Sequence, residues 1–227
     1  MSNVVNLKIP GAEGAPGGSS DGKKTESVEN YEKPLQQLMN IIEHVLVWRD
    51  PYTASHQRRT TNLAYAIAMQ MNIDSNVAAG IRAACSVHDI GKIRVPSEIL
   101  ARPGNLSRSE QLLIMEHPVK GYEILQTIEF PWPVAAIVLQ HHERIDGTGY
   151  PYRLKGPDIC LEAKVIAVAD IVEAMASHRP YRPALGFSAA CQQIIRNKGV
   201  LYDQQVVDAC INLFAKREVE DVLGGIS

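Results

Sequence analysis

The sequence predicts an all-α fold formed by a single helical domain. Apolar residues recur at a spacing of three to four over much of the chain, which is the period of an amphipathic helix. Alternating patterns of β-branched residues, typical of half-buried strands, are scarce, and no internal repeat is visible. With 227 residues and 45% hydrophobic composition, the chain can bury one good core, since a domain typically takes roughly 100 to 200 residues.

Residues 1–27 differ in composition from the rest of the chain. They contain the segment GAEGAPGGSSDGKK, which is rich in Gly, Ser and Pro and poor in large apolar side chains. Such a segment cannot offset the entropy lost on ordering. We therefore expect a flexible leader or linker over residues 1–27 and the folded domain over residues 28–227.

Two amphipathic helices are expected at the start of the domain. Apolar side chains repeat at helical spacing over residues 31–48. Pro51 ends this first helix, because the residue before a proline disfavours the α conformation. A second helix is expected over residues 53–71, in which His56 lies on the same face as Leu63 and Ile67. His56 therefore points inward.

A third helix is expected to end at the dipeptide His88-Asp89. Ile81, Cys85 and His88 fall on one stripe of this helix. Gly91 follows at a position where a helix C-terminus often needs a left-handed residue. The His-Asp pair is thus expected at a helix end, directed at the core.

The second half of the chain alternates helices with polar connections. Residues 94–109 hold two prolines and a glycine and are expected to form a surface connection. His117-Pro118 is typical of a helix start, with proline in the first turn. Further helices are expected over residues 134–142, 161–176, 188–195 and 204–216, and the intervening segment DGTGYPYRLKGPD is expected to form turns.

Charge and composition exclude several classes of protein. The formal net charge is -2 and the pI is about 6.4, so no global field attracts a nucleic acid polymer. No apolar run is long enough to span a bilayer, and the N-terminus lacks the pattern of a secretory signal. The four cysteines are spread out without a CxxC pair. These features favour a cytoplasmic protein with no membrane span.

A series of histidines and aspartates is the strongest functional feature. Imidazole nitrogens combined with a few carboxylate oxygens suit divalent iron, manganese, zinc or nickel. One inward histidine is usually a hydrogen-bonded core residue, but five histidines with two acids favour a metal-dependent hydrolase. In chain order the series is His56, His88, Asp89, His117, His141, His142 and Asp170.

Local context strengthens the metal hypothesis for Asp170 in particular. Asp170 lies in the apolar run VIAVADIV, and an uncompensated buried carboxylate costs several kcal/mol, which a metal would offset. His141 and His142 would project about 100° apart from a regular helix. Either they bind different ions, or the helix ends there. The remaining histidines, His44 and His178, lie outside the series and are interpreted as structural or solvated.

The motifs around these residues resemble those of the HD-GYP family, cyclic di-GMP phosphodiesterases within the HD superfamily. The resemblance extends from about residue 29 to about residue 215, with separate motifs in the family's order. They read DPYTASHQRR, VHDIGKIRVP, EHPVKGYEIL, HHERIDGTGYP, VIAVADIVEAM and SHRPYR. The resemblance implies hydrolysis of cyclic di-GMP to linear pGpG, with onward cleavage to GMP left open. It also implies two divalent ions, with iron or manganese favoured and nickel, zinc or magnesium as alternatives.

The resemblance also implies a role for each residue of the series. His56, His88 and Asp170 are assigned to one metal, His117 and His141 to the other, Asp89 to a bridge between them, and His142 to a further ligand position. Lys92 is expected to meet the scissile phosphate and offset its developing charge. Some family members carry a glutamate four residues before the first histidine that helps to hold a third metal. Here that position is Tyr52, a poor ligand at neutral pH, so two metals are expected.

Substrate contacts are implied near both ends of the resemblance. Arg179 and Arg182 match positions that contact a substrate phosphate or base, and guanidinium groups suit both. His178 replaces the aspartate that usually precedes the first arginine, which is expected to loosen its orientation. Asp50 matches a position near the guanine, with capping of the next helix as the alternative.

The loop over residues 146–151, DGTGYP, supplies the name of the family through Gly149, Tyr150 and Pro151. Its glycines permit positive φ, and its proline stiffens the exit. In the family this loop sets shape and contacts partners, and GGDEF-domain cyclases are the suggested partners. A purely structural role for Tyr150 stays open, and so does the oligomeric state, with a homodimer among the options.

Three alternatives to the leading function stay open. The substrate could instead be 3',3'-cyclic GMP-AMP. The chain could be a metal-binding signalling module with weak turnover, although the intact Lys92 argues against this. It could also be a di-iron oxygenase, but the GYP loop and the two arginines favour phosphodiester chemistry.

Overall fold

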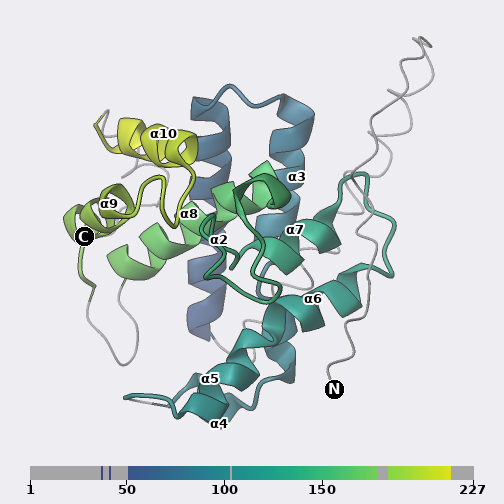
Figure 1. Ribbon diagram of the computed structural model, residues 1–227. Helices are drawn as coiled ribbons and strands as arrows, with labels where there is room; N and C mark the ends of the chain where they lie inside the picture. The colour runs from purple at the N-terminus through teal and green to yellow at the C-terminus, as the bar shows by residue number, and fades with distance from the viewer. Residues whose placement is uncertain (1–36, 38–40, 42–50, 103, 178–183, 216–227) are drawn as a thin grey trace.

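The computed structural model describes residues 37, 41, 51–102, 104–177 and 184–215 (Figure 1). In this part of the chain the regular structure is helical, which confirms the all-α prediction. Its elements are α2 (Pro51–Gln70), α3 (Ser75–Ser86), η1 (Ile90–Arg94), α4 (Ser97–Leu100), α5 (Arg108–Met115), α6 (His117–Leu125), α7 (Val134–Gln140), η2 (Gly156–Asp158), α8 (Leu161–Ala176), α9 (Phe187–Arg196) and α10 (Gln204–Ala215). The expected leader, nearly all of the expected helix over residues 31–48, and both outlying histidines fall outside the described residues.

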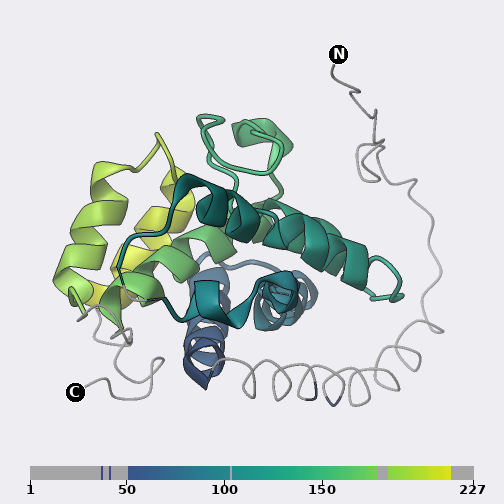
Figure 2. The same ribbon diagram turned by 90° about the horizontal axis from the view of Figure 1, so that it is seen from below.

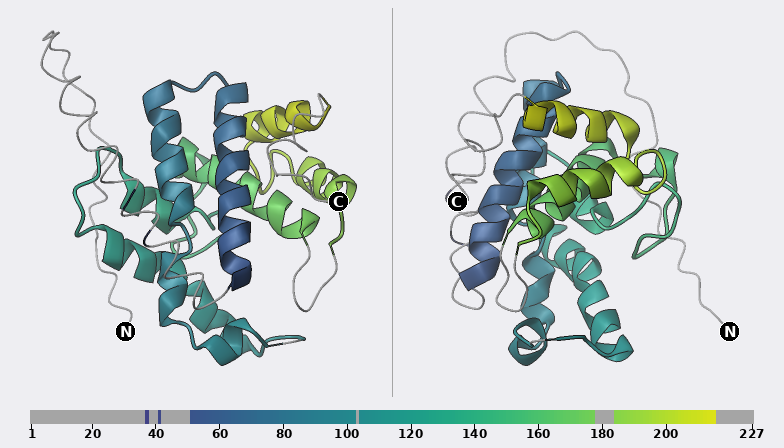
Figure 3. Two further views of the ribbon diagram at one scale, coloured as in Figure 1. Left: turned by 180° about the vertical axis from the view of Figure 1, so that it is seen from behind. Right: turned by 90° about the vertical axis from the view of Figure 1, so that its left-hand side faces the viewer.

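Helices α2, α3 and α8 form the centre of the molecule. α2 and α3 lie side by side and antiparallel, joined by a short turn (Figures 1 and 3). Asn72 has a φ of 55° in this turn, and Asp74 caps α3 by accepting from the backbone of Asn76 at 2.9 Å. α8 packs across both helices. The inward face holds fully buried side chains from three helices, including Leu63, Ile67, Ile81 and Ile166.

The remaining helices surround this centre on different sides. α9 and α10 pack against α8, and Figure 2 shows them together at one side of the molecule. α7 packs on α3 and α6, and α6 packs on η1. Among the described helices, none combines the length and the apolar character that crossing a bilayer requires.

Most helix boundaries agree with the sequence analysis to within two residues, and α8 spans the predicted range. The stretch over residues 94–109, expected to form a surface connection, also contains helical segments. This stretch contains the one-turn helix α4, and its last two residues form the start of α5. Ser107 and Glu110 start α5 through a reciprocal capping box.

The expected left-handed conformation of Gly91 is wrong. Gly91 lies inside η1 and is not among the residues with positive φ. Instead, a Cβ atom at this position would lie 1.9 Å from the backbone oxygen of His117 and 2.6 Å from the backbone nitrogen of Gly121. Glycine is needed because the backbones of η1 and α6 touch here. This contact holds the segment after Asp89 against the start of α6.

We expect Gly91→Ala to lower the stability of the protein strongly, because the added methyl group meets backbone that cannot rotate away. Overpacking of this kind costs about 3 kcal/mol, which corresponds to a fall in Tm of roughly 6 to 12 °C for a chain of this size. Thermal unfolding followed by circular dichroism measures the change. Gly156→Ala is the control, since its Cβ would meet nothing closer than 3.8 Å. Equal Tm values for the two variants would contradict this reading of Gly91.

Candidate metal centre

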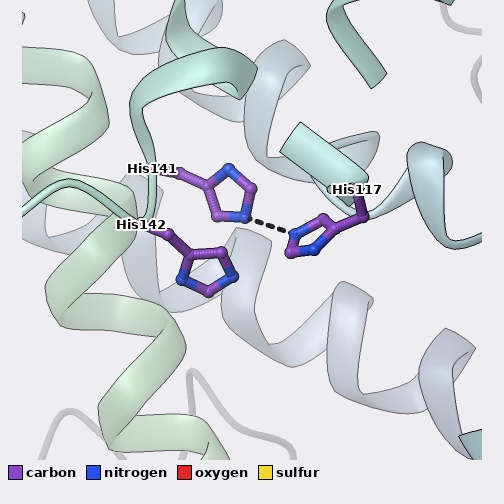
Figure 4. Close-up of side chains that lie close together, drawn as sticks. All are labelled: His117, His141 and His142. Carbon is purple, nitrogen blue, oxygen red and sulfur yellow. Dashed lines mark hydrogen bonds between the residues drawn. The ribbon is translucent and has the colours of Figure 1, made fainter. Parts of the chain in front are cut away.

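Among the described residues, candidate ligands form three groups in the interior, and two of these share no residue. The His56 group consists of His56, His88 and Asp170, and the His117 group consists of His117, His141 and His142. The third, His88, Asp89 and His141, takes one histidine from each of the other two and adds Asp89. In each group one ligand atom from every residue lies within 4.8 Å of the others. Figure 4 shows the His117 group, with the three rings directed toward one another. The structure therefore brings together six of the seven residues of the series in two triads.

Asp89, the seventh residue, lies between the two groups. It is 1% exposed. Its Oδ1 lies 3.4 Å from Nε2 of His117, and its Oδ2 lies 3.6 Å from Nε2 of His88. One carboxylate oxygen thus faces each group, as a bridging ligand requires.

Three of the histidines are oriented by the ends of helices. His88 donates from Nδ1 to the backbone oxygen of Cys85 at 2.7 Å, at the end of α3. His117 and His141 do the same at the ends of α5 and α7, to residues 114 and 138 at 2.8 and 2.6 Å. The last carbonyls of a helix lack helical partners, so they are free to accept. Each bond turns the Nε2 atom of its ring toward the interior.

This orientation creates an arrangement that fits a cation. The Nε2 atoms of His117 and His141 lie 3.2 Å apart, along the dashed line in Figure 4. Because Nδ1 of each ring carries the donated proton, Nε2 of each neutral ring is an acceptor. Two acceptors that face each other at this distance repel, and a shared cation would satisfy both. The donor set of imidazoles and carboxylates is one that divalent transition metals bind.

His56 is oriented by a carboxylate rather than by a helix end. Glu173 on α8 is 0% exposed and accepts a hydrogen bond from Nδ1 of His56. The Nε2 atom of His56 then lies 3.2 Å from Oδ1 of Asp170. Glu173 also accepts from Nε of Arg59 at 2.6 Å and from the hydroxyl of Ser177 at 2.5 Å.

The sequence analysis missed Glu173. Its signal was available, because Glu173 follows Asp170 by one helical turn in the same apolar helix. The argument that a buried carboxylate needs a partner applies to both residues.

Burial and charge divide the titrating groups into two classes. Burial lowers the pKa of His56, but hydrogen bonds with Asp170 and Glu173 outweigh it and raise the pKa to about 9. Burial also disfavours charge on His88, whereas the adjacent Asp89 raises its pKa to about 9. Burial lowers the pKa of His117 to about 4, and it holds the pKa of both His141 and His142 well below the usual value.

The acids of the centre are held in their charged form. Burial by itself raises the pKa of Asp89, but Lys92 and the neighbouring histidines bring it well below the usual value. Hydrogen bonding from His56 similarly overcomes burial and lowers the pKa of Asp170 and of Glu173. Without metal, protonated His56 and His88 compensate these carboxylates.

We expect the stability of the metal-free protein to be highest near pH 6.5. His56 and His88 have pKa values of about 9 in the folded protein and about 6.5 when unfolded. Their contribution is complete below pH 6.5 and is lost as the pH rises through 9. The three histidines with lowered pKa values act in the opposite sense, so stability also falls as the pH drops from 6.5 toward 4. Each histidine changes the free energy of unfolding by up to about 1.4 kcal/mol per pH unit.

Thermal unfolding in the presence of a chelator, from pH 4 to pH 9.5, measures this profile. His56→Gln is the informative comparison, because it removes one of the two groups responsible for the alkaline fall. The slope between pH 7 and pH 9 should then become shallower. A Tm that rises over this range in the unmodified protein would contradict the assigned charges.

The end of α7 settles how the adjacent histidines are arranged. α7 ends at Gln140, and His141 is its C-cap. Of the two alternatives, the helix ends there, and both rings join the His117 group with centroids 4.1 Å apart.

The GYP loop packs directly against this group. The ring of Tyr150 stacks on His142 with centroids 4.8 Å apart, and the Tyr150-Pro151 peptide bond is cis. Buried Glu143, another residue that the sequence analysis missed, accepts from the backbone nitrogens of Tyr152 and Leu154 at 2.7 and 3.0 Å. The loop is therefore tied to the residue that follows His142.

The glycines of this loop have two different roles. Gly147 has a φ of 84°, as expected. Gly149 does not have positive φ, and the expectation was wrong for this residue. A Cβ atom there would lie 2.5 Å from Cα of Glu143, so glycine allows the loop to approach the backbone.

Lys92 lies at the edge of the centre. Its Nζ atom donates to Oδ2 of Asp89 at 2.6 Å, and its side chain is 27% exposed. This contact was not expected from the sequence. The other predicted substrate contacts, Asp50, Arg179 and Arg182, fall outside the described residues, and so does the side chain of Tyr52.

Comparison with protein families identifies a match to the HD domain over residues 37–206. The chain is similar to the cyclic di-GMP phosphodiesterase response regulator RpfG of Xanthomonas campestris pv. campestris, with 34% identity over 88% of this chain and 53% of that protein. It is 36% identical to a cyclic di-GMP phosphodiesterase of Thermotoga maritima, over 87% of this chain and 54% of that protein. The 3'3'-cGAMP-specific phosphodiesterase 1 of Vibrio cholerae is 31% identical, over 84% of this chain and 46% of that protein. The chain spans about half the length of these curated relatives.

Solved structures show the same fold. Bd1817, a HDG"Y"P protein from Bdellovibrio bacteriovorus, matches with a TM-score of 0.61 and 18% identity, over 84% of this chain and 64% of that chain. The HD domain of the phosphodiesterase PgpH from L. monocytogenes matches with a TM-score of 0.57 and 22% identity, over 78% of this chain and 98% of that chain. At these identities the likeness concerns the arrangement of helices.

Proposed function

The chain belongs to the HD domain family, in which it resembles the HD-GYP members, and we propose that it hydrolyses cyclic di-GMP to linear pGpG at a centre of two divalent metal ions. The observation that carries this proposal is the position of Asp89. Its two oxygens face different groups of ligands, at 3.4 Å from His117 and 3.6 Å from His88. A carboxylate placed in this way suits a pair of ions better than a single one.

The side chains of the centre would share the work with the metals. When bound, two divalent ions supply an activated water and offset charge on the phosphoryl oxygens. The His56 group and the His117 group would each hold one ion, and Asp89 would hold both. Lys92 is half-buried beside Asp89, and its flexible stem would let the ammonium group turn to the scissile phosphate and stabilise the charge that develops there.

The substrate proposal draws on the relatives and on the sequence motifs. Two relatives are cyclic di-GMP phosphodiesterases, and Arg179 and Arg182 would contact a phosphate or a base. Asp50 would lie near the guanine. The relative specific for 3'3'-cGAMP supports that dinucleotide as the second candidate. Onward cleavage of pGpG to GMP is the further step that the resemblance implies.

The metals, partners and location also belong to the proposal. Imidazole and carboxylate donors favour iron or manganese and also accept nickel, zinc or magnesium. Two ions per chain are proposed because Tyr52 replaces the extra glutamate. GGDEF-domain proteins and a second copy of the chain are the proposed protein partners. A reducing cytoplasm agrees with the four cysteines, all of which are free.

Incubation of manganese-loaded protein with cyclic di-GMP, 3',3'-cyclic GMP-AMP and cyclic di-AMP in separate reactions tests the proposal. Chromatographic separation should show linear pGpG as the first product from cyclic di-GMP. Asp170→Asn is the control, because it removes a candidate ligand from the His56 group. Absence of turnover in fully loaded protein would favour the weakly active signalling module. Turnover that depends on oxygen would favour the di-iron oxygenase.

A further inference from the structure

His56 differs from three other histidines of the two ligand groups in the partner that lies behind its ring. His88, His117 and His141 donate from Nδ1 to neutral backbone carbonyls. His56 instead donates to the carboxylate of Glu173. The difference follows from position, because the three other residues come one or two places after a helix C-terminus, whereas His56 lies inside α2. Carbonyls inside a helix are already bonded, so the ring needs a partner from another helix.

This carboxylate changes the ligand strength of His56. A negative partner at Nδ1 fixes the proton there and makes the Nε2 lone pair a stronger donor to a metal. The partner of Nε2 in this structure is Asp170 at 3.2 Å, so the ring points at the place where an ion would sit. A carbonyl partner fixes the same tautomer but adds no charge.

The His56 group also carries more negative charge than the His117 group. The His56 group contains the carboxylate of Asp170 and has that of Glu173 directly behind it, whereas the His117 group consists of imidazoles. Asp89 faces both groups and does not distinguish them. Arg59 offsets part of the charge of Glu173, but it bonds to the other oxygen and is itself partly exposed. A buried carboxylate attracts a divalent cation far more strongly than a neutral ring does.

We infer that the His56 group binds its ion first and more tightly than the His117 group, and that Glu173 is the positioning residue responsible for this order. The inference rests on the two-ion centre of the proposed function. It adds that the two sites are unequal and that a residue outside both groups sets the inequality.

Glu173→Gln tests the role of Glu173 most directly, because it keeps the shape of the side chain and removes the charge. Arg59 and Ser177 both donate to Oε1, so the amide oxygen would remain on their side and the amide NH2 would face His56. Nδ1 of His56 would then have to accept, and its proton would move to Nε2. That tautomer cannot bind a metal through Nε2.

The experiment is titration of the metal-free full chain with Mn²⁺ alone, with free Mn²⁺ followed by electron paramagnetic resonance. The unmodified protein should bind two ions per chain with different affinities. Glu173→Gln should weaken the tighter ion by about 10-fold to 100-fold and leave the weaker ion unchanged. His142→Ala should remove the weaker ion, and Asp170→Asn the tighter one. Glu123→Gln, the same chemical change on the exposed face of α6, is the control and should alter neither.

Each outcome separates the order of binding from the proposed function. Two ions of equal affinity, or a Glu173→Gln variant that weakens only the weaker ion, would overturn the order while leaving the two-ion centre intact. Binding of a single ion by the unmodified protein would contradict the two-ion centre itself. If Glu173→Gln does not fold, as judged by circular dichroism, His142→Ala and Asp170→Asn still decide which group binds its ion more tightly. Retention of the tighter ion by Asp170→Asn would then overturn the inference.

Discussion

Asp89→Asn is expected to abolish hydrolysis of cyclic di-GMP and to lower the amount of bound metal. The substitution keeps the size of the side chain and removes the charge of a carboxylate that is 1% exposed and lies between both ligand groups. Charge stabilisation by metal ions supplies several kcal/mol in the transition state. Each ~1.4 kcal/mol is about tenfold in rate, so we expect a loss of about a thousandfold or more.

Two measurements on the same sample check this expectation. Product formation from cyclic di-GMP reports the rate, and elemental analysis reports the ions per chain. Asp208→Asn removes an aspartate that pairs with Lys198 at the surface, and it should affect neither value. Near-normal hydrolysis by Asp89→Asn would exclude the bridging role.

Lys92→Ala is expected to slow the chemical step while the metals stay bound. Losing one charge-assisted contact to the developing charge of the phosphoryl group should raise the barrier by about 2.7 to 4 kcal/mol, or about a hundredfold to a thousandfold in rate. The contact between Nζ of Lys92 and Oδ2 of Asp89 at 2.6 Å also predicts how the amount of bound metal should respond. Removing a cation from the carboxylate that is proposed to bind both ions should leave the metal content unchanged or raise it.

Single-turnover cleavage at saturating cyclic di-GMP isolates this step from binding and product release. Lys198→Ala, which removes a lysine from a surface ion pair, serves as the comparison. An unchanged cleavage rate would place Lys92 among the surface cations. If Lys92→Ala instead loses its metal ions, Lys92 would be assigned to the metal sites.

Together the two variants separate the roles of neighbours in one motif. Asp89 and Lys92 are three residues apart and share an ion pair, so each substitution disturbs the other residue. The metal content distinguishes them, because it should fall in the aspartate variant and not in the lysine variant. Activity alone would not make this distinction.

Local patterns in the sequence were sufficient for the helical class and for the residues that the structure brings together in the candidate ligand groups. Helical periodicity is a property of neighbouring residues, so α8 could be located to the residue. The seven-residue series was likewise recognisable, because motifs such as His88-Asp89 and His141-His142 are contiguous in the chain. Gly91 shows the limit of this approach. Its place after a helix suggested a left-handed turn, whereas the need for glycine comes from α6, about 26 residues further along.

The tertiary structure alone decided how these residues combine. It placed one oxygen of Asp89 toward each ligand group and ended α7 so that His141 and His142 reach the same group. It also set Glu173 behind His56, although 117 positions separate the two. Sequence patterns report which face of a helix is buried, but not which other helix packs against that face. The direction of a lone pair or a proton at the centre depends on that packing, because it is set by partners that only folding brings within hydrogen-bonding distance.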